Sequence, residues 1–498
     1  MSIPFALLRY SKHATVFGMD FYRYVSRDHT LQYWPYLPPI GATYSGEAEY
    51  MHDFVDLAPT YFAPRPVLLP FVLATAGQGS SVHEGLDVKY PLSTTMTAVG
   101  TLFPDFATIE QDVTNVNFSY TEKYISDQRP FFAEGINFLP YSDMFYSRRI
   151  ESVDEGFKLV GKQGNTTIGV LGTNAAGPNA QDAEVMHLQQ DLGALSRVQV
   201  DYAGDSQAGI PSSQMVKVEG LYGWRAGSTS YGIDANHVPT WQNGLGRDSK
   251  DILLFYNTAP FGRPSYSVLY TDIGPRFESN IGYNPEIDRR GTAFDISQYN
   301  QFNIGHVQSY NVDLSYDSYD HHTGGFYHDD LSASGHISTR SGLYYEADYS
   351  ASNRNQLDGS TLDLFHDRTG TCAFSWGQNT LFQQGSVSDS FGRLASQPYN
   401  YLSLSQGMVI CRNFSGVLFY NALVLGGSRS SQTVVTSTYH INAVQTLGSR
   451  VILQDNNTDI YLSFGQHVRS GNDIYVLVGD PNSARTRGIV TMKWVRPI

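Results

Sequence analysis

The stretch that decides the fold is residues 214–225, QMVKVEGLYGWR, in which apolar and polar side chains alternate. Val216 and Val218 fall on one side of an extended chain, whereas Lys217 and Glu219 fall on the other. Successive side chains of a strand point to opposite faces, so this pattern predicts a strand with one apolar face and one polar face.

The same alternation recurs along most of the chain. It is clear in residues 197–202, 311–317, 343–349 and 490–494, and turn-like clusters separate the copies. Short turns between alternating runs indicate hairpins rather than βαβ units. The sequence therefore predicts an all-β fold, a large closed antiparallel, up-and-down β-barrel of roughly 16–20 strands. A soluble sandwich or propeller is the alternative, because periodicity alone does not say which face is inside.

Composition favours a wall in contact with lipid. Charged residues make up 16 % and aromatic residues 13 % of the 498 residues, whereas a soluble domain normally carries about 25 % charge. A lipid-facing surface must exclude charge, and Tyr and Trp suit its boundary with water. No apolar run reaches the roughly 20 residues of a membrane helix, so a chain of this kind would cross a bilayer as a barrel. The net charge of −14 and the scattered Lys and Arg argue against a nucleic-acid partner.

We expect three parts along the chain. Residues 1–28 contain two strand-like runs that resemble the last hairpin of a β-domain, and residues 29–65 form a linker or a strap. Residues 66–498 form the barrel, with an inserted segment at 104–150 that lacks alternation. An insertion of this length plugs a lumen or forms a structured surface loop, and a short helix is expected within residues 112–125. Residues 274–299 and 383–398 are expected to lie outside the wall.

The first residues, MSIPFALLRYSKH, lack the basic start, apolar stretch and cleavage site of a secretory signal. An outer-membrane barrel must be exported. We therefore expect export to depend on sequence missing from the N-terminus.

Motifs for catalysis or metal binding are not found. The sequence has no GxSxG elbow, HExxH helix, P-loop or CxxC pair, so we predict no catalytic residues, no metal site and no cofactor. The histidine-rich and aspartate-rich residues 317–330 could converge on a divalent cation, but a solvated hairpin tip is favoured. A disulfide between Cys372 and Cys411 and two separate thiols are both open.

Several motifs resemble one known family. They are GLDVKYPLSTTMTAVGTLFPDFATIEQD at 85–112, QRPFFAEGINFL at 128–139, DMFYSRRI at 143–150, DIGPRFESNIGYNPEIDRRG at 272–291 and RGIVTMKWVRPI at 487–498. In this order and spacing they resemble a bacterial family of unknown function. Its members are outer-membrane-like proteins with an N-terminal family-9-type carbohydrate-binding domain and a C-terminal β-barrel. The resemblance covers residues 66–498.

The resemblance implies an outer-membrane location in a Gram-negative envelope. It also implies that residues 1–28 are the remnant hairpin of the β-sandwich carbohydrate-binding module, so that the chain is N-terminally truncated and a separate chain could supply the missing module. Ala133 stands where the family usually has Leu. We expect the charged residues of the loop to form ion pairs that pin it within the barrel, namely Arg129, Glu134, Arg148 and Arg149.

The favoured function is an outer-membrane barrel, with the lipid bilayer as a partner and a transport, docking or structural role for a small polar or saccharide ligand. A membrane-associated hydrolase of glycans, with carboxylates such as Asp313 or Glu346 as acid and base, is one alternative. A soluble secreted lectin-like β-protein is another. The expected lumen-lining residues are Arg197, Asp201, Lys217, Glu219, Asp313, Glu346 and Asp348.

Overall fold

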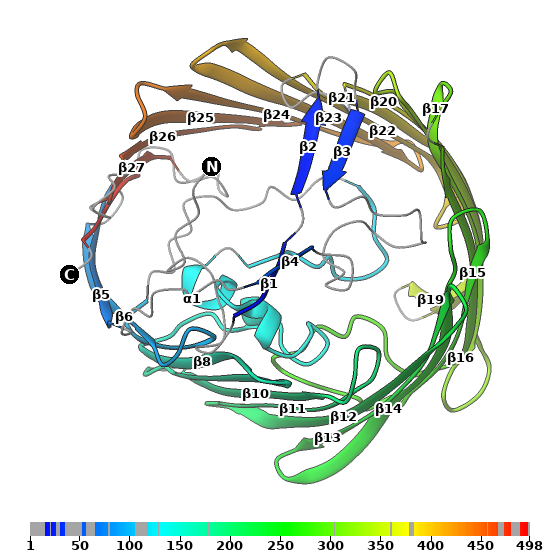
Figure 1. Ribbon diagram of the computed structural model, residues 1–498, viewed down its shortest axis with the longest axis horizontal. Coiled ribbons are helices and arrows are strands. Elements are labelled where there is room, and N and C mark those ends of the chain that lie inside the picture. The colour runs from blue at the N-terminus through cyan, green and yellow to red at the C-terminus, as the bar shows by residue number, and fades with distance from the viewer. Residues whose placement is uncertain are drawn as a thin grey trace.

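A ring of 24 strands, β5 to β28, forms one closed antiparallel barrel (Figure 1). The computed structural model describes residues 15–19, 21–25, 30–34, 52–55, 65–77, 80–104, 117–127, 129–177, 180–302, 304–358, 361–377, 383–455, 457–466, 473–479 and 489–496. Each strand pairs with its sequence neighbours, and β28 pairs with β5 to close the ring. The closed antiparallel barrel predicted from the sequence is confirmed, whereas the expected number of 16–20 strands is too low.

The barrel strands are β5 (Val67–Ala76), β6 (Ser81–Pro91), β7 (Met96–Leu102), β8 (Glu155–Gln163), β9 (Thr166–Asn174), β10 (Gln181–Asp191), β11 (Arg197–Gln207), β12 (Ile210–Ala226), β13 (Thr229–Gln242), β14 (Leu245–Thr258), β15 (Pro264–Ile273), β16 (Arg289–Gln301), β17 (Val307–Asp320), β18 (Phe326–Thr339), β19 (Tyr344–Asp358), β20 (Thr361–Trp376), β21 (Gly385–Leu394), β22 (Gln397–Cys411), β23 (Phe414–Leu425), β24 (Ser428–His440), β25 (Gln445–Gln454), β26 (Asn457–Gln466), β27 (Asp473–Val478) and β28 (Val490–Val495).

The register of the wall brings like side chains together. Val200 of β11 is opposite Val218 of β12, and Asp201 is opposite Lys217. The two valines are exposed on the outer side, whereas Asp201 is 0 % and Lys217 is 4 % exposed. Cross-strand neighbours share a face, so the period-two pattern of each strand adds up to an apolar outer surface and a polar inner one.

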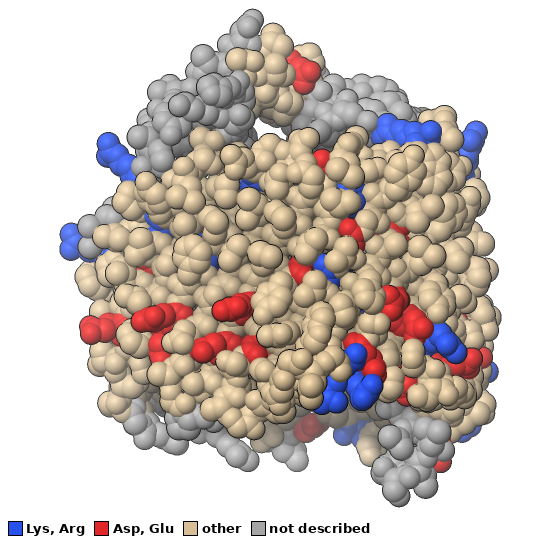
Figure 2. All heavy atoms as spheres, turned by 90° about the horizontal axis from the view of Figure 1, so that it is seen from below, with Lys and Arg blue, Asp and Glu red and all other residues tan. Residues whose placement is uncertain are grey.

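On the face that Figure 2 shows, the outer surface is mostly uncharged, and Asp and Glu gather in a belt toward one rim of the wall. On β10 the exposed carboxylates Asp182 and Glu184 come at one end of the strand, and the exposed apolar Met186 and Leu188 follow. The charge on this strand therefore lies toward the edge of the wall.

Between β7 and β8 the chain leaves the wall for residues 103–154, which we call the inserted segment. It carries α1 (Pro130–Ala133) and the 3-10 turns η3 (Ile136–Phe138) and η4 (Ser147–Arg149). The part around these elements lies within the ring against the wall at β8 to β12 (Figure 1). The helix expected within residues 112–125 is wrong for residues 117–125, and residues 112–116 lie outside the described part. The helical turn comes later because Pro130 at its first position fixes a helical φ.

Two short strand pairs precede the barrel. β1 (Phe17–Met19) pairs with β4 (His52–Phe54), and β2 (Phe21–Val25) pairs with β3 (Thr30–Trp34). In the view of Figure 1, β1 and β4 lie near the centre of the ring, whereas β2 and β3 overlap the wall near β21 and β23. The first predicted run, residues 3–10, lies outside the described residues.

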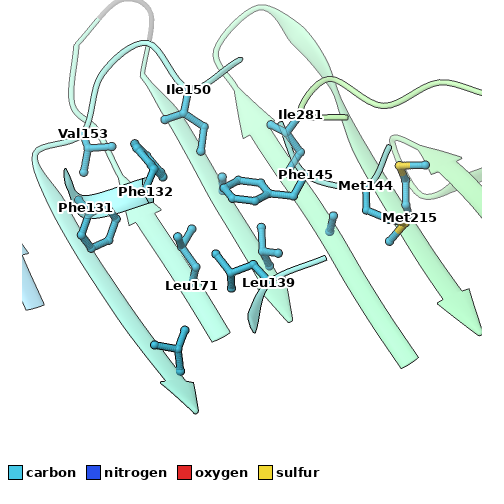
Figure 3. Close-up of a cluster of buried hydrophobic side chains, with 14 of the residues drawn as sticks. Phe131, Phe132, Leu139, Met144, Phe145, Ile150, Val153, Leu171, Met215 and Ile281 are labelled. Atoms are coloured by element: carbon cyan, nitrogen blue, oxygen red, sulfur yellow. The ribbon is translucent and has the colours of Figure 1, made fainter. Parts of the chain in front are cut away.

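A buried apolar cluster joins the inserted segment to the wall (Figure 3). Phe132, Phe145 and Ile150 of the inserted segment pack with Leu171 of β9 and Val185 of β10. These inward aliphatic side chains interrupt the polar inner face where the segment covers them. Burial of this apolar surface is what holds the segment against the wall.

Residues 274–288, between β15 and β16, form a second inner layer that we call the inner loop. Its Phe277 and Ile281 belong to the same buried cluster, and the Tyr146 backbone nitrogen donates to the Ile281 carbonyl oxygen at 2.6 Å. The expectation that residues 274–299 lie outside the wall is therefore wrong, as is that for residues 383–398, which contain β21. Small polar residues such as Ser386 and Ser388 on β21 weaken the apolar alternation there.

No helix of the described residues is long and apolar enough to span a membrane.

Candidate functional site

A row of polar side chains crosses three wall strands beneath the inserted segment. The register places Thr167 of β9 opposite Gln189 of β10, and Gln189 opposite Gln199 of β11. We call these three residues the polar row. In the adjacent row, His187 lies opposite Asp201. Five strand-borne side chains with hydrogen-bonding atoms therefore meet on one rigid patch of the inner wall.

Hydrogen bonds within the wall fix the orientation of this patch. His187 Nδ1 is 2.7 Å from Asp201 Oδ1, and Gln199 Nε2 donates to Asp201 Oδ2 at 2.6 Å. Gln189 Nε2 donates to Asp191 Oδ1 at 2.8 Å. An ionised carboxylate only accepts, so the proton of a neutral His187 ring lies on Nδ1 and leaves Nε2 as an acceptor.

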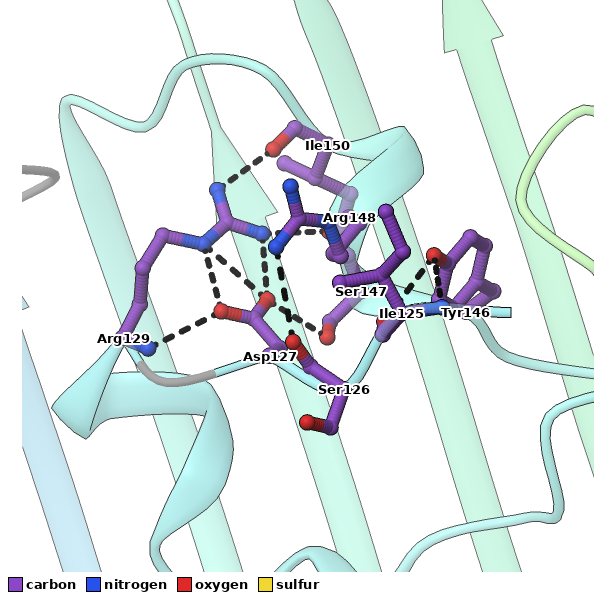
Figure 4. Close-up of polar contacts among 8 residues, drawn as sticks. All are labelled: Ile125, Ser126, Asp127, Arg129, Tyr146, Ser147, Arg148 and Ile150. Carbon is purple, nitrogen blue, oxygen red and sulfur yellow. Dashed lines mark hydrogen bonds and ion pairs between the residues drawn. The ribbon is translucent and has the colours of Figure 1, made fainter. Parts of the chain in front are cut away.

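Above the wall, a network around Asp127 holds the inserted segment in shape (Figure 4). Arg129 donates through Nε and Nη2 to Asp127, with the closest approach 2.6 Å, and also reaches the carbonyl oxygens of Ser147 and Ile150. Ser147 Oγ donates to Asp127 Oδ2 at 2.7 Å. Burial acts to raise the pKa of Asp127, but the hydrogen bonds from Arg129 and Ser147 outweigh it and hold the pKa below its usual range.

Two basic side chains of the wall fasten the turn that contains α1. Lys158 of β8 is fully buried, and its Nζ donates to the carbonyl oxygens of Phe131 and Glu134. Lys89 of β6 forms an ion pair with Glu134 at 2.5 Å. Gly135, which follows, has a φ of +75°, a left-handed conformation that glycine adopts without steric cost. The RPFFAEG motif is thus a wall-anchored turn.

Between the inserted segment and the polar row lies a pocket of about 640 Å³. This volume is within the range of small-molecule sites. Tyr124 and Tyr141 line it and are 53 % and 65 % exposed. The full lining is Tyr124, Ser126, Asp127, Phe132, Ala133, Ile136, Asn137, Phe138, Leu139, Pro140, Tyr141, Ser142, Phe145, Ser147, Thr167, His187, Gln189 and Gln199.

Ion pairs of Glu286 anchor the inner loop to the wall, away from the pocket. Glu286 accepts from Arg289 at 2.8 Å and from Arg354 of β19 at 2.7 Å. Burial acts to raise the pKa of Glu286, but the charges of Arg289 and Arg354 outweigh it and keep the pKa below its usual range. Tyr120 of the inserted segment donates to Asp367 of β20 at 2.5 Å. The inner segments are therefore tied to both sides of the ring.

The loop residues singled out from the sequence have partners that the sequence did not indicate. Arg129 pairs with Asp127, Glu134 with Lys89, and Arg149 with Glu122. Arg148 donates instead to the carbonyl oxygen of Ser126 at 3.4 Å. Glu122 and Asp127 come from a stretch without periodicity, so no pattern connects them with their partners.

The wall residues singled out from the sequence form two groups. Lys217 Nζ lies 2.5 Å from Glu219 Oε2, and Arg197 Nη2 lies 3.1 Å from Glu219 Oε1. Together with Asp201 they sit on β11 and β12 next to the pocket.

The second group lies on β17 to β19, away from the pocket. The register places Asp313 and Asp348 on either side of Ser334, and Glu346 opposite His336. The hydrolase hypothesis that rests on Asp313 and Glu346 stays a prediction.

The histidine-rich hairpin divides its side chains among separate carboxylates. His321 pairs with Asp288, His322 with Asp272, and His328 with Asp317. No group of three metal-ligating side chains occurs within the part of the chain that the structure describes. Cys372 and Cys411 are free thiols, which settles the open question of a disulfide.

Sequence reasoning missed four residues that line the pocket, Asp127, His187, Gln189 and Gln199. It also missed Lys158, which anchors the turn that contains α1. The alternation on β10 puts His187 and Gln189 on one face, and this signal was available. No signal in the sequence indicates that the inserted segment lies over His187 and Gln189, because this position depends on contacts between residues far apart in the chain.

Comparisons with known proteins found one family model and several solved structures to which the chain is similar. A family described as a domain of unknown function, DUF5916, matches residues 65–168, which include β5 to β8 and the inserted segment. No curated protein has a significant match to the chain.

Solved structures of similar fold include outer-membrane receptors and a porin. The siderophore receptor PirA from Pseudomonas aeruginosa is 7 % identical with a TM-score of 0.48, and the match covers 88 % of this chain and 81 % of that one. The ferric enterobactin receptor PfeA in complex with BCV-L6 is 8 % identical with a TM-score of 0.36, over 88 % and 82 % of the two chains. A mutant of the Rh. blastica porin is 10 % identical with a TM-score of 0.28, over 58 % and 91 %.

Proposed function

We propose that the protein is an outer-membrane barrel that docks or transports a small polar ligand, such as a saccharide, at the pocket between the inserted segment and the wall. The observation that carries this proposal is the closed ring of strands with an apolar outer face and a polar inner face. A soluble protein of this size would hide its apolar face.

The lipid bilayer accounts for the exposed apolar side chains. Val198, Val218, Leu253, Phe294 and Leu314 lie on different strands of the wall, and each is between 45 % and 54 % exposed. In water this much contiguous apolar surface would drive aggregation. In a bilayer the closed ring satisfies every strand hydrogen bond and leaves no edge.

Docking is favoured over an open water-filled channel because the inserted segment and the inner loop occupy part of the lumen. Both are fixed by buried contacts, which include the apolar cluster and the Asp127 network. A ligand that enters would meet the pocket of about 640 Å³.

Expression in a Gram-negative host behind a secretory signal, followed by membrane fractionation, tests the location. We expect the full chain in the outer-membrane fraction, with release only by detergent. Unboiled samples should migrate faster in gels than boiled ones, because a closed barrel resists unfolding by detergent at room temperature. Extraction into buffer without detergent would reject the proposal and favour the lectin-like alternative.

A further inference from the structure

We propose that the pocket selects an uncharged ligand that carries several hydroxyl groups and one apolar face, and that it discriminates against carboxylate and ammonium analogues of the same size. This inference rests on the proposed docking function and specifies the ligand class for the same site.

The first step concerns charge. Among the residues that the structure describes, the lining has no Lys or Arg and one carboxylate, Asp127, which accepts hydrogen bonds from Arg129 and Ser147 through both oxygens. Behind the lining, Asp201 accepts from Gln199 and is bonded to His187. A ligand charge that left water for this pocket would find no unpaired opposite charge among these side chains, and loss of hydration by an unpaired charge is costly.

The second step concerns hydrogen bonds. Within the described residues, the side chains of Gln189 and Gln199 each form one hydrogen bond, from Nε2 to a wall carboxylate. Each amide therefore keeps its oxygen as an acceptor and one N–H as a donor. A hydroxyl group uses both, since it donates and accepts. A carboxylate can only accept, and an ammonium group can only donate.

The third step concerns shape. Opposite the polar row, the pocket is lined by Phe132, Phe145 and Ile136 of the inserted segment, with Tyr124 and Tyr141 also in the lining. Aromatic rings bind the C–H surface of a ligand at low entropic cost and keep a polar edge for hydrogen bonds. The strand side of the pocket is thus polar, whereas the inserted-segment side combines these rings with Ser126, Asn137, Ser142 and Ser147. This arrangement fits a ring compound with hydroxyls at its edge.

Three trimers of matched size test the charge selection. Isothermal titration of the full chain in detergent would compare maltotriose, which is neutral, with trigalacturonate, which is anionic, and with the trimer of glucosamine, which is cationic. We expect maltotriose to bind at least tenfold more tightly than either charged trimer. Tighter binding of a charged trimer would overturn this inference and leave the docking function intact. Binding of none of the three would overturn both, provided that the same sample shows heat-modifiable migration.

Variants of the wall connect the binding to the residues. We expect Gln189→Leu and Gln199→Leu each to weaken maltotriose binding about tenfold or more, which corresponds to about 1.4 kcal/mol or more. Gln454→Leu, on β25 and outside the pocket lining, should leave the affinity unchanged. Tyr141→Ala, at a side chain that is 65 % exposed, provides a second variant that the fold tolerates, and we expect a similar loss. Unchanged affinity in all three pocket variants would place the ligand elsewhere and reject the inference.

Discussion

Lys158 is the residue that most directly connects the wall with the inserted segment. It is fully buried, and its Nζ donates to the backbone carbonyl oxygens of Phe131 and Glu134. In Lys158→Met these buried carbonyl groups lose their donor, at a cost of about 1–3 kcal/mol. We expect residues 129–150 to open more easily, with faster amide hydrogen exchange in this range, while heat-modifiable migration of the barrel persists.

Lys162 on the same strand provides the matched control. Its ion pair with Asp191 is partly exposed, with side-chain exposures of 46 % and 26 %, and such pairs contribute about 0–1 kcal/mol. Lys162→Met should leave hydrogen exchange in residues 129–150 unaltered. Equal exchange rates in the two variants would show that Lys158 is not an anchor.

Asp127 makes the inserted segment sensitive to acid. Its pKa in the folded protein lies below the ordinary value of about 3.9, because the hydrogen bonds from Arg129 and Ser147 outweigh the effect of burial. The stabilisation is therefore complete above the ordinary value and is lost as the pH falls through the folded-state pKa. We expect hydrogen exchange in residues 129–150 to accelerate, relative to its intrinsic rate, as the pH falls below about 4.

Asp127→Asn tests the assignment of this acid sensitivity. The variant lacks the titrating group and should open more easily at neutral pH, with a weaker dependence on pH in the acidic range. An acid response identical to that of the unaltered chain would assign the response to another group.

At the scale of residues, the sequence shows on which side of the wall a side chain lies but not what it meets. The positions of Lys217 and Glu219 on the face opposite Val216 and Val218 follow from a period of two. The pairing of Arg129 with Asp127 does not follow from such a period, because Asp127 lies in a stretch where no repeating geometry relates neighbours in space.

The packing of one element on another depends on a glycine of β9. A Cβ on Gly169 would lie 1.8 Å from the carbonyl oxygen of Phe138, which belongs to η3. The backbone of the inserted segment approaches the wall this closely only because Gly169 has no side chain. Gly169→Ala should push η3 away from β9, loosen residues 136–141 in hydrogen exchange, and weaken ligand binding at the pocket.

Gly172 on the same strand offers a control, because a Cβ there would meet nothing within 4 Å. Gly172→Ala should leave both measurements unaltered. The same effect in both variants would mean that alanine perturbs strand β9 itself rather than the contact with Phe138.

At the scale of elements, strands with strong alternation were predictable and those with weak alternation were not. β12 was evident from its apolar and charged residues, whereas β21 has serines on its inner face and was assigned to a loop. The expected strand number was too low for this reason. The inner loop was placed outside because its burial depends on the inserted segment, which is distant in sequence.

At the scale of the whole molecule, size explains why inner segments are needed. The diameter of a barrel grows with its number of strands, and barrels of 22 strands have a lumen that a plug occupies. A ring of 24 strands encloses more space than its own side chains can fill. Here the inserted segment and the inner loop bury Val185, Leu171 and Met215 of the wall, so the lumen has a core against strands β9, β10 and β12.

The inserted segment begins and ends at adjacent strands of the wall. Leu102 at the end of β7 pairs directly with Glu155 at the start of β8, so residues 103–154 connect two strands that are already adjacent. A two-residue turn such as the Asn243–Gly244 turn between β13 and β14 fits a gap of this kind.

With residues 103–154 replaced by Asn-Gly, we expect heat-modifiable migration to persist. Conductance in a planar bilayer should rise above that of the full chain, because the segment no longer occupies the lumen. The barrel should also melt at a lower temperature, since the apolar side chains of the wall lose their cover. Unchanged conductance would show that other parts of the chain close the lumen, and loss of the folded band would show that the wall needs the segment in order to form.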